Sequence, residues 1–375
     1  MFPRSSGVLL PIPCLPSSFG IGDLGPYSYR LADYLYSAGQ RVWQILPLNP
    51  TSPTYRHSPY HSASSVAGNP LLISPERLAA EGLLGWGELP APEFPEGRIN
   101  YAAVACMKQR LLGKACARFR QRLPNDGYTQ FCKEKSSWLD DYALFSALSE
   151  RYPDEAWNRW PAEIQQRRPE VLARLRAELE EVLEDIKIAQ YFFYQQWSRL
   201  RTYLREKGIL IFGDLPIYVP FQSVDVWAHP HLFKLDETGS PLAVSGVPPD
   251  YFSTHGQLWG HPVYRWGAHR ETRYEWWVRR FARTLSLFEK RRLGLILGRE
   301  PALDELHWDM IRLAMMSQAW MCIIPAQDLL GLGSEARINC SGRYEGNWLW
   351  RMSPGQFAAL PQKRWRELTE AVGRL

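Results

Sequence analysis

One stretch of this sequence constrains the fold more than any other. Residues 169–208 carry the strongest helical pattern, with Pro169 suited to the first helical turn and Gly208 suited to the position just past the end. A continuous apolar run at residues 209–212 follows at once, and it gives way to Asp214. An apolar run directly after a helix is typical of a strand buried in a parallel sheet, which places the chain in the α/β class. The apolar face expected for the helix comprises Leu172, Leu175, Leu179, Val182, Leu183 and Ile186.

The same pattern recurs at both ends of the chain. A helix is expected over residues 28–39, followed by a strand at residues 42–46. Near the C-terminus, a helix over residues 308–318 precedes an apolar run at residues 321–324. Repeated units of helix, buried strand and polar loop predict an α/β barrel, in which the loops after the strands carry function. The candidate loops are residues 49–62, 214–225 and 327–333.

Residues 81–185 differ from the rest of the chain. They open with a proline-rich segment and then become helical, with apolar residues at i, i+3 and i+4 over residues 102–122 and 138–152. We therefore predict a helical insertion subdomain over residues 81–185, between barrel segments at residues 1–80 and 186–375.

Charge and hydropathy exclude several classes of partner. The net charge is +5, but the basic residues are scattered beside acidic ones, so neither a nucleic-acid surface nor a polybasic membrane surface is expected. No apolar run approaches the roughly 18 residues that a membrane span needs. Prolines at positions 11, 13 and 16 interrupt the apolar N-terminal stretch, so a signal peptide is not expected.

The cysteines and histidines do not form a pattern that binds metal. The six cysteines contain no Cys-x-x-Cys pair, which favours reduced, buried thiols in a cytoplasmic protein. His57 and His61 lie close together in one loop, but they lack further convergent ligands and are interpreted as loop residues. No metal is therefore expected.

The aromatic content is unusually high, with 16 Trp and 18 Tyr residues. Flat aromatic faces can pack against glucose rings, but aromatic residues also fill protein cores. Composition alone favours the core interpretation.

The loop sequences themselves are specific, and eight motifs that occur in order resemble the amylomaltases, also called 4-α-glucanotransferases or disproportionating enzymes. They are SFGIGDLG (residues 18–25), VWQILPLNPT (42–51), SPYHSASSVAGNPLLIS (58–74), IFGDLPIYV (211–219), DVWAHPHLF (225–233), GVPPDYFSTHGQLWGHPVYRW (246–266), IPAQDLLGLGSEARIN (324–339) and GNWLWR (346–351). The resemblance implies a TIM-barrel fold. It also implies that the protein is cytoplasmic and uses no cofactor. It also implies transfer of α-1,4-glucan segments between maltodextrins, or to glucose as acceptor.

The resemblance further implies a retaining mechanism, in which two carboxylates about 5–5.5 Å apart act as nucleophile and as acid/base. The family motifs that carry these groups, and a third motif with a supporting Asp, are absent from this sequence. No residue of this chain is therefore assigned as catalytic. The junction is expected at residues 288–293, where strands four to seven of the family, on the order of 120 residues, are missing.

By the order of the family's strands, strands one, two, three and eight are expected to remain, and they should be contiguous because strand eight neighbours strand one in a closed barrel. The fold expected is thus an incomplete TIM barrel with an inserted helical subdomain, and the retained strands should lie in the order eight, one, two, three. The outer strands would have open edges, so we expect a marginal monomer or self-association through them.

Five residues are candidates for glucan binding by resemblance. Tyr60 corresponds to a family tyrosine that lines the glucan groove, with a loop anchor as the alternative. Trp259 corresponds to a family tryptophan on a flexible loop near the acceptor side, where a sugar contact is favoured. Asp214 ends a buried strand, and by resemblance it lies at the floor of the donor site, but a structural carboxylate explains it equally well. Asn347 resembles a family side chain near the sugar, and binding and structural roles are equally favoured for it. For Asp328, which ends the last strand, a structural role is favoured. A substitute acid/base pair of Asp214 and Asp328 is not expected, because their strands are the outer ones.

Three functional hypotheses follow. The chain is an active 4-α-glucanotransferase, a non-catalytic α-glucan-binding remnant, or half of a split enzyme. The absent carboxylates predict that the lone chain is inactive or strongly impaired, since removing a set of catalytic groups costs many orders of magnitude in rate.

Overall fold

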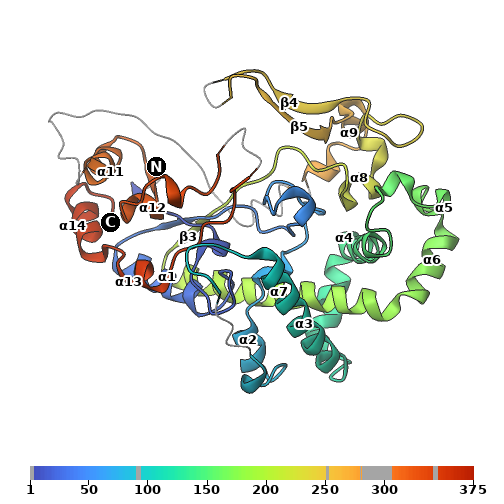
Figure 1. Ribbon diagram of the computed structural model, residues 1–375, viewed down its shortest axis with the longest axis horizontal. Coiled ribbons are helices and arrows are strands. Elements are labelled where there is room, and N and C mark those ends of the chain that lie inside the picture. Colours follow the sequence, from blue (N-terminus) through green and yellow to red (C-terminus); the bar gives the residue numbers. More distant parts are fainter. Residues whose placement is uncertain (1–3, 90–93, 251–252, 279, 281–305, 341–344) are drawn as a thin grey trace.

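A computed structural model describes the chain except for residues 1–3, 90–93, 251–252, 279, 281–305 and 341–344 (Figure 1). Its centre is a parallel four-stranded sheet in the order β3-β2-β1-β6. The strands are β1 (Ser5–Leu9), β2 (Val42–Gln44), β3 (Leu210–Phe212) and β6 (Met321–Pro325). This order confirms the one predicted for family strands three, two, one and eight. The junction expected at residues 288–293 lies outside the described residues.

The first strand, β1, was not placed by the sequence patterns. It is short, contains two serines and a glycine, and has no helix before it in the sequence. Gly7 lies opposite Val42 in the register, and a Cβ at position 7 would collide with the Val42 carbonyl group. Close approach of the two backbones therefore requires glycine there.

Helices surround the sheet and form the insertion. They are α1 (Pro26–Ser37), α2 (Pro75–Ala80), α3 (Tyr101–Arg120), α4 (Asp126–Arg151), α5 (Ala162–Gln165), α6 (Pro169–Glu178), α7 (Glu180–Glu206), α8 (Val224–Ala228), α9 (Trp266–Glu271), α11 (Leu306–Met316), α12 (Ala326–Leu329), α13 (Pro354–Ala358) and α14 (Gln362–Ala371). No helix of the described residues is long and apolar enough to cross a membrane. The expected helix at residues 138–152 proves to be the second half of α4, which begins earlier because Asn125 caps it.

The single helix predicted over residues 169–208 is divided into α6 and α7 at Leu179. This prediction was wrong at one point, because Leu179 leaves helical geometry (φ −105°, ψ 15°). The break also changes the apolar face: Val182, expected to be buried, is 42% exposed, whereas Leu172 and Leu183 are buried. No glycine or proline marks the break, so the cause lies in tertiary packing.

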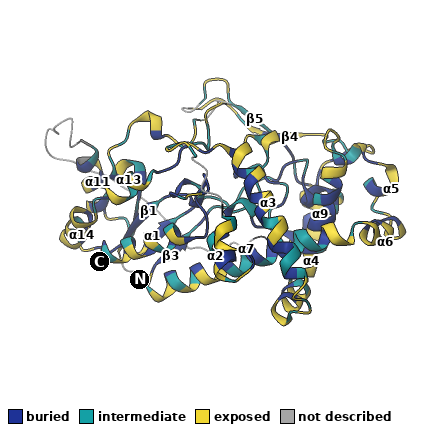
Figure 2. Cartoon of the chain, turned by 60° about the horizontal axis from the view of Figure 1, so that its bottom comes forward, coloured by how far each residue is buried: buried dark blue, intermediate teal, exposed yellow. Residues whose placement is uncertain are grey.

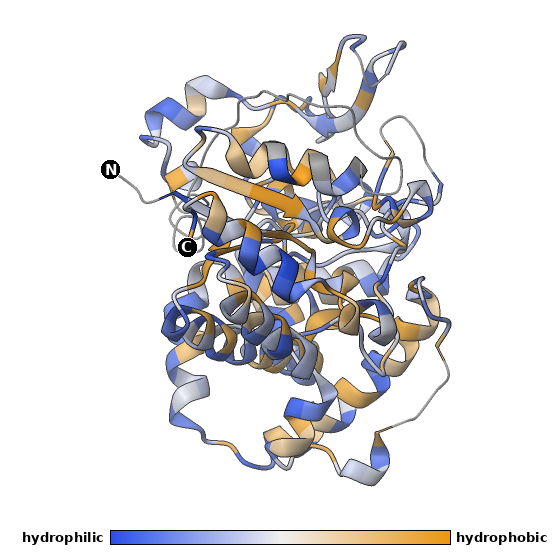
Figure 3. Ribbon diagram, turned by 90° about the vertical axis from the view of Figure 1, so that its left-hand side faces the viewer, coloured by the Kyte–Doolittle hydropathy of each residue, from blue (hydrophilic) through white to orange (hydrophobic). Residues whose placement is uncertain are grey.

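The described residues form two large hydrophobic cores and a smaller third one. One core lies around the sheet and contains Trp43, Phe192 and Ile324, and the other lies in the helical region and contains Phe145 and Trp227. α6 and the start of α7, at Leu183, pack in the second core, whereas the rest of α7 packs in the first from Ile188 onward. Figure 2 shows that buried residues concentrate between the helices, and Figure 3 shows the apolar colouring of the strands.

α7 is the long helix that runs from the helical region to the sheet in Figure 1. It packs against α3 and α4 and also against α1 and β3. It therefore runs without a break through the predicted boundary between residues 185 and 186. The division into three segments remains a prediction.

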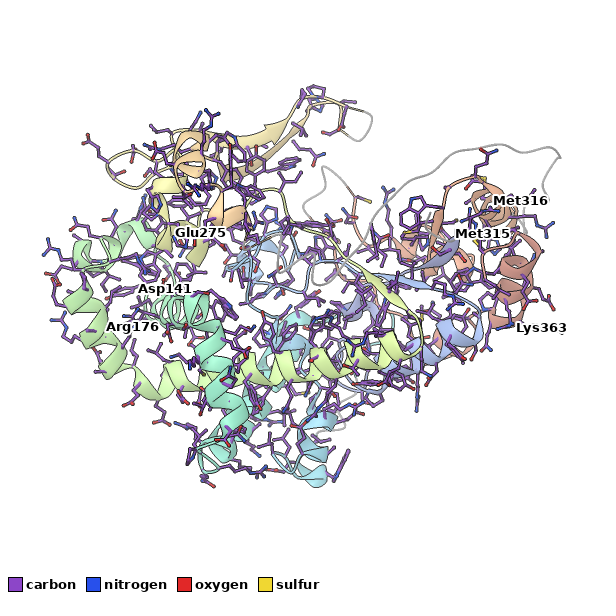
Figure 4. The ribbon with its side chains drawn as sticks, turned by 180° about the vertical axis from the view of Figure 1, so that it is seen from behind. Asp141, Arg176, Glu275, Met315, Met316 and Lys363 are labelled. Atoms are coloured by element: carbon purple, nitrogen blue, oxygen red, sulfur yellow. The ribbon has the colours of Figure 1, made fainter. Side chains whose placement is uncertain are left out.

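Ion pairs and buried hydrogen bonds tie the distant parts together. Asp141 of α4 binds Arg167 at 2.8 Å and Arg176 of α6 at 3.4 Å, and Figure 4 shows Asp141 and Arg176 on neighbouring helices. At the other end of the molecule, the fully buried Arg374 donates hydrogen bonds to the Met315 and Ser5 carbonyl oxygens. The C-terminal segment is thereby held against β1.

An antiparallel hairpin lies beside the C-terminal loops of the sheet. It consists of β4 (Val244–Val247) and β5 (Gln257–Pro262), at the top of Figure 1. The side chains of β5 alternate, so that Leu258 is 75% exposed whereas His261 is buried. Short helices α8 and α9 flank the hairpin in the sequence.

Candidate functional site

The loops after β2 and β3 meet at the carboxyl edge of the sheet. Parallel strands end at the same edge, so residues that follow them gather there. The hydroxyl of Tyr60, in the loop after β2, donates a 2.6 Å hydrogen bond to Oδ2 of Asp214, which lies two residues past β3. Both side chains are half-buried. Burial, and then the neighbouring Asp214 charge, raise the pKa of the Tyr60 hydroxyl, so that it remains a donor. The structure thus brings two predicted residues into contact.

The loop that carries Tyr60 is held in an unusual conformation. Arg56 and His57 both have positive φ angles, of 50° and 57°, a region that few residues other than glycine adopt. The His57 ring stacks on Tyr101 of α3, with centroids 3.9 Å apart and planes at 4°. Burial lowers the pKa of His57 to about 4, so the ring is neutral at pH 7. His57 therefore anchors the loop to the helical insertion.

Trp259 reaches the same region from the β4–β5 hairpin. Its ring is half-buried and contacts Tyr218, with centroids 6.3 Å apart. His61, the neighbour of Tyr60, hydrogen-bonds to the main chain of Trp259, and the His61 ring contacts His261 at 4.5 Å between centroids. These contacts join the hairpin to the Tyr60 loop. Tyr60, Asp214 and Trp259 therefore form one neighbourhood, named here the edge site.

Buried Asp225 fixes the segment that follows this loop. Its carboxylate accepts hydrogen bonds from the amide and the hydroxyl of Ser65, at 2.7 and 2.6 Å. Ser223 caps α8, which carries Asp225. The two loops after β2 and β3 are thus tied to one another at a second point.

A cavity of about 620 Å³ adjoins the edge site. It lies between the helices α4 and α7 and the loops after β2 and β3, and it has a size common for small-molecule sites. Of the five predicted residues, only Asp214 lines it. Its other walls combine aromatic and charged side chains, including Trp138, Asp141, Trp197, Arg201, Asp225, Trp276 and Arg280.

These wall residues were not predicted as site residues. The aromatic run along α7, residues 191–197, is a signal that could have indicated them, since it follows the apolar face of the helix into the region of the sheet. Trp138 and Trp276 have no such signal, because they lie on elements far apart in the sequence. Of the three candidate loops, those at residues 49–62 and 214–225 contribute to the cavity, and the one at residues 327–333 does not.

The other two predicted residues lie in the C-terminal part of the chain, Asn347 directly before Trp348 and Asp328 after β6. The side chain of Asn347 binds the backbone of Cys340, accepting from its amide at 2.7 Å and donating to its carbonyl at 3.4 Å. Asp328 is exposed on α12, after β6. Asp214 follows β3 and Asp328 follows β6, and these two strands are three strand spacings apart, about 14 Å along the sheet.

Within the described residues, no group of three or more His, Cys, Asp and Glu side chains is arranged to hold a metal ion. The six cysteines are unpaired. Cys14, Cys116 and Cys322 are buried as expected, but Cys106 is exposed and the other two are partly exposed. Burial raises the pKa of Cys14 to about 12, which keeps its thiol protonated and unreactive.

Sequence comparison with known proteins identifies the family of this chain. A sequence model described as 4-alpha-glucanotransferase matches residues 10–300 and 296–357. The 4-alpha-glucanotransferase of Aquifex aeolicus is 34% identical over 469 aligned positions, which cover 93% of this chain and 95% of the relative. The 4-alpha-glucanotransferase of Synechocystis is 33% identical over 497 aligned positions, which cover 99% of this chain and 98% of the relative. Both alignments are longer than the 375 residues of this chain, so the relatives contain positions without a counterpart here.

A solved structure supports the same assignment. An amylomaltase from Streptococcus agalactiae in complex with acarbose superposes with a TM-score of 0.87 at 28% identity, covering 99% of both chains. The fold and the edge site thus define an α/β protein related to the amylomaltases. This chain belongs to the 4-alpha-glucanotransferase family.

Proposed function

We propose that this chain binds α-1,4-glucans at the edge site and that, alone, it does not transfer glucan segments efficiently. The observation that carries the proposal is the contact between Tyr60 and Asp214 at the carboxyl edge of the sheet. A carboxylate can accept hydrogen bonds from sugar hydroxyls, and the faces of Tyr60 and Trp259 can pack against the apolar faces of glucose rings. The S. agalactiae amylomaltase, which has a related fold, holds the carbohydrate acarbose.

We expect no efficient glucan transfer because the reaction requires a pair of carboxylates. Retaining transfer needs two carboxylates about 5–5.5 Å apart, and even an inverting pair lies within about 9.5 Å. Asp214 and Asp328 follow β3 and β6, the two outer strands of the described sheet, so we do not expect them to form either arrangement. The family motifs for the nucleophile, the acid/base and the supporting Asp do not occur in the sequence, and the relatives carry positions that this chain lacks.

Incubation with maltotriose tests this proposal directly. Free glucose and longer maltodextrins are followed for several hours, and maltoheptaose binding is measured on the same preparation by isothermal titration calorimetry. We expect binding without transfer products. Glucose together with longer products would show that the lone chain is an active transferase, and Asp214 and Asp328 would then be the first residues to substitute. A folded chain that neither binds nor transfers would contradict glucan binding.

A second candidate function is that of one half of a split enzyme. Among the described residues, β3 and β6 each pair on one side only, and relatives contain positions without a counterpart in this chain. Co-expression with a fragment of the A. aeolicus relative that spans those positions tests this idea. Transfer activity only in the mixture would support complementation, whereas an inactive mixture that forms no complex would oppose it.

The resemblance supports two further features of this proposal. One is a cytoplasmic location, and the other is glucose as an acceptor in a complemented enzyme. Self-association through the outer strands, β3 and β6, is a further expectation.

A further inference from the structure

Trp348 lies within the GNWLWR motif but was not named as a candidate site residue, and it contacts the edge site. Its indole ring lies 5.8 Å from the Tyr60 ring, centroid to centroid, with planes inclined at 56°. The indole is half-buried, as is Tyr60. Two aromatic faces at this inclination form a corner rather than a single flat wall. Tyr60 is in turn bound to Asp214, so the corner lies beside a carboxylate.

The backbone of Trp348 is in a region that costs free energy for a side chain of this size. Its φ angle is +64°, in the left-handed region, and such conformations cost of order 1–3 kcal/mol for residues other than glycine. Gly346, two residues earlier, also has a positive φ, of 79°. A tryptophan at a position where glycine fits without strain indicates that the ring itself has a use.

That use is not the anchoring of the loop, because the main chain and other residues anchor it. The Trp348 amide donates a 2.6 Å hydrogen bond to the Ile338 carbonyl oxygen, and the Trp348 carbonyl accepts a 3.1 Å hydrogen bond from the Tyr101 hydroxyl. Asn347 binds the Cys340 backbone on both sides. Both of these Trp348 hydrogen bonds involve its main chain and therefore survive removal of the ring.

We propose that Trp348 is a glucan-binding residue, whose indole ring forms with Tyr60 an aromatic corner that holds one glucose unit next to Asp214. This inference rests on the proposed glucan binding and adds a residue to it. Rigid aromatic side chains of this kind dominate binding energy at protein interfaces, because they bring large contact area at low entropic cost. The two aromatic faces of the corner would pack against one pyranose ring, and the Asp214 carboxylate would accept hydrogen bonds from its hydroxyl groups.

The left-handed backbone allows a clean deletion of the ring. Trp348→Gly removes the indole and adopts the observed φ without strain, so the loop anchors remain. Trp348→Phe retains an aromatic face. Trp86→Ala is the matched control, since Trp86 is 64% exposed on a short helical turn at residues 86–88, away from the edge loops.

The test measures maltoheptaose affinity by calorimetry and the melting temperature of each full-length variant. We expect Trp348→Gly to weaken binding about tenfold or more with an unchanged or higher melting temperature, Trp348→Phe to retain affinity within about threefold, and Trp86→Ala to have no effect on affinity. If Trp348→Gly lowers the melting temperature and retains full affinity, the ring is only structural and the inference is overturned.

The outcomes also separate this inference from the function on which it rests. A wild-type chain that binds maltoheptaose while Trp348→Gly binds equally well overturns the role of Trp348 alone. A folded wild-type chain that does not bind overturns both.

Discussion

The Tyr60 hydroxyl donates a 2.6 Å hydrogen bond to Oδ2 of Asp214, and 154 positions of sequence separate the two residues. The bond joins the loop after β2 to the loop after β3. Because its acceptor is a carboxylate, it belongs to the stronger class of hydrogen bonds. It holds the phenol ring in one orientation beside Trp348 and therefore shapes the edge site before a ligand arrives.

We predict that Tyr60→Phe weakens maltoheptaose binding by about 1–2 kcal/mol, or roughly 5- to 30-fold. The variant retains the aromatic face but releases the ring from Asp214, so part of the prearranged geometry is lost. Tyr60→Ala, which also removes the face, should weaken binding further. Calorimetric titration of both variants measures the two steps. Equal affinities for wild type and Tyr60→Phe would show that the hydrogen bond does not contribute to binding.

A buried ion pair joins the helical insertion to the N-terminal loops. Lys108 of α3 binds Oδ2 of Asp23 at 2.9 Å and donates to the Ile73 carbonyl at 2.6 Å, and both side chains are at least 96% buried. Oδ1 of Asp23 also accepts from the Gly25 amide. Removal of either partner leaves the other charge buried without compensation.

We therefore predict that Lys108→Ala lowers the free energy of unfolding by about 3–5 kcal/mol. Lys114→Ala is the matched control on the same helix, because Lys114 pairs with Glu88 at the surface, where such pairs contribute about 0–1 kcal/mol. Urea unfolding of the three proteins measures both values. A loss of less than 1 kcal/mol in Lys108→Ala would mean that water or a nearby group compensates Asp23.

Local patterns in the sequence predicted the elements in which local and tertiary preferences agree. Apolar runs after helices located β3 and β6 to within a residue, because strands of a parallel sheet are rich in apolar residues along their length. The strand order followed from barrel closure and the family resemblance. The strand β1 was missed because its sequence, SSGVL, is not a continuous apolar run. Its glycine, Gly7, is required by the close approach of the β1 and β2 backbones and not by side-chain packing.

The sequence could not predict features that depend on contacts between distant segments. No local signal indicates the break at Leu179, because neither glycine nor proline lies there and the apolar pattern continues through it. Likewise, resemblance identified Tyr60 and Asp214 separately, but only the folded chain shows that they are hydrogen-bonded. Trp348 was overlooked because its significance lies in a backbone angle and a ring contact.

The contact between His61 and His261 predicts a pH dependence. Burial, together with the nearby His61, lowers the pKa of His261 to about 4, and burial also lowers the pKa of His61. The ordinary value is near 6.5, so the unfolded chain takes up protons first as the pH falls. The stabilisation is fully present above about pH 6.5 and is lost as the pH falls toward 4.

We predict that the free energy of unfolding decreases between pH 6.5 and 5, with up to about 1.4 kcal/mol per pH unit for each histidine. His261→Gln should reduce this slope, because it removes one of the two facing rings. His255→Gln, at an exposed position between β4 and β5, serves as control. Urea unfolding at pH 7, 6 and 5 gives the slopes. If His261→Gln retains the wild-type slope, other groups cause the dependence.

The outer strand β3 predicts how the chain behaves in solution. Among the described residues it pairs only with β2, and Leu210 on it is 55% exposed. An unpaired apolar edge promotes association, and a lysine on the edge opposes it. We expect the wild-type chain to self-associate with rising concentration in light-scattering chromatography, and Leu210→Lys to shift it toward the monomer. Val182→Lys, at an exposed apolar position of α7, should have no such effect. A monodisperse wild-type monomer with a cooperative thermal transition would show that the edge is already protected.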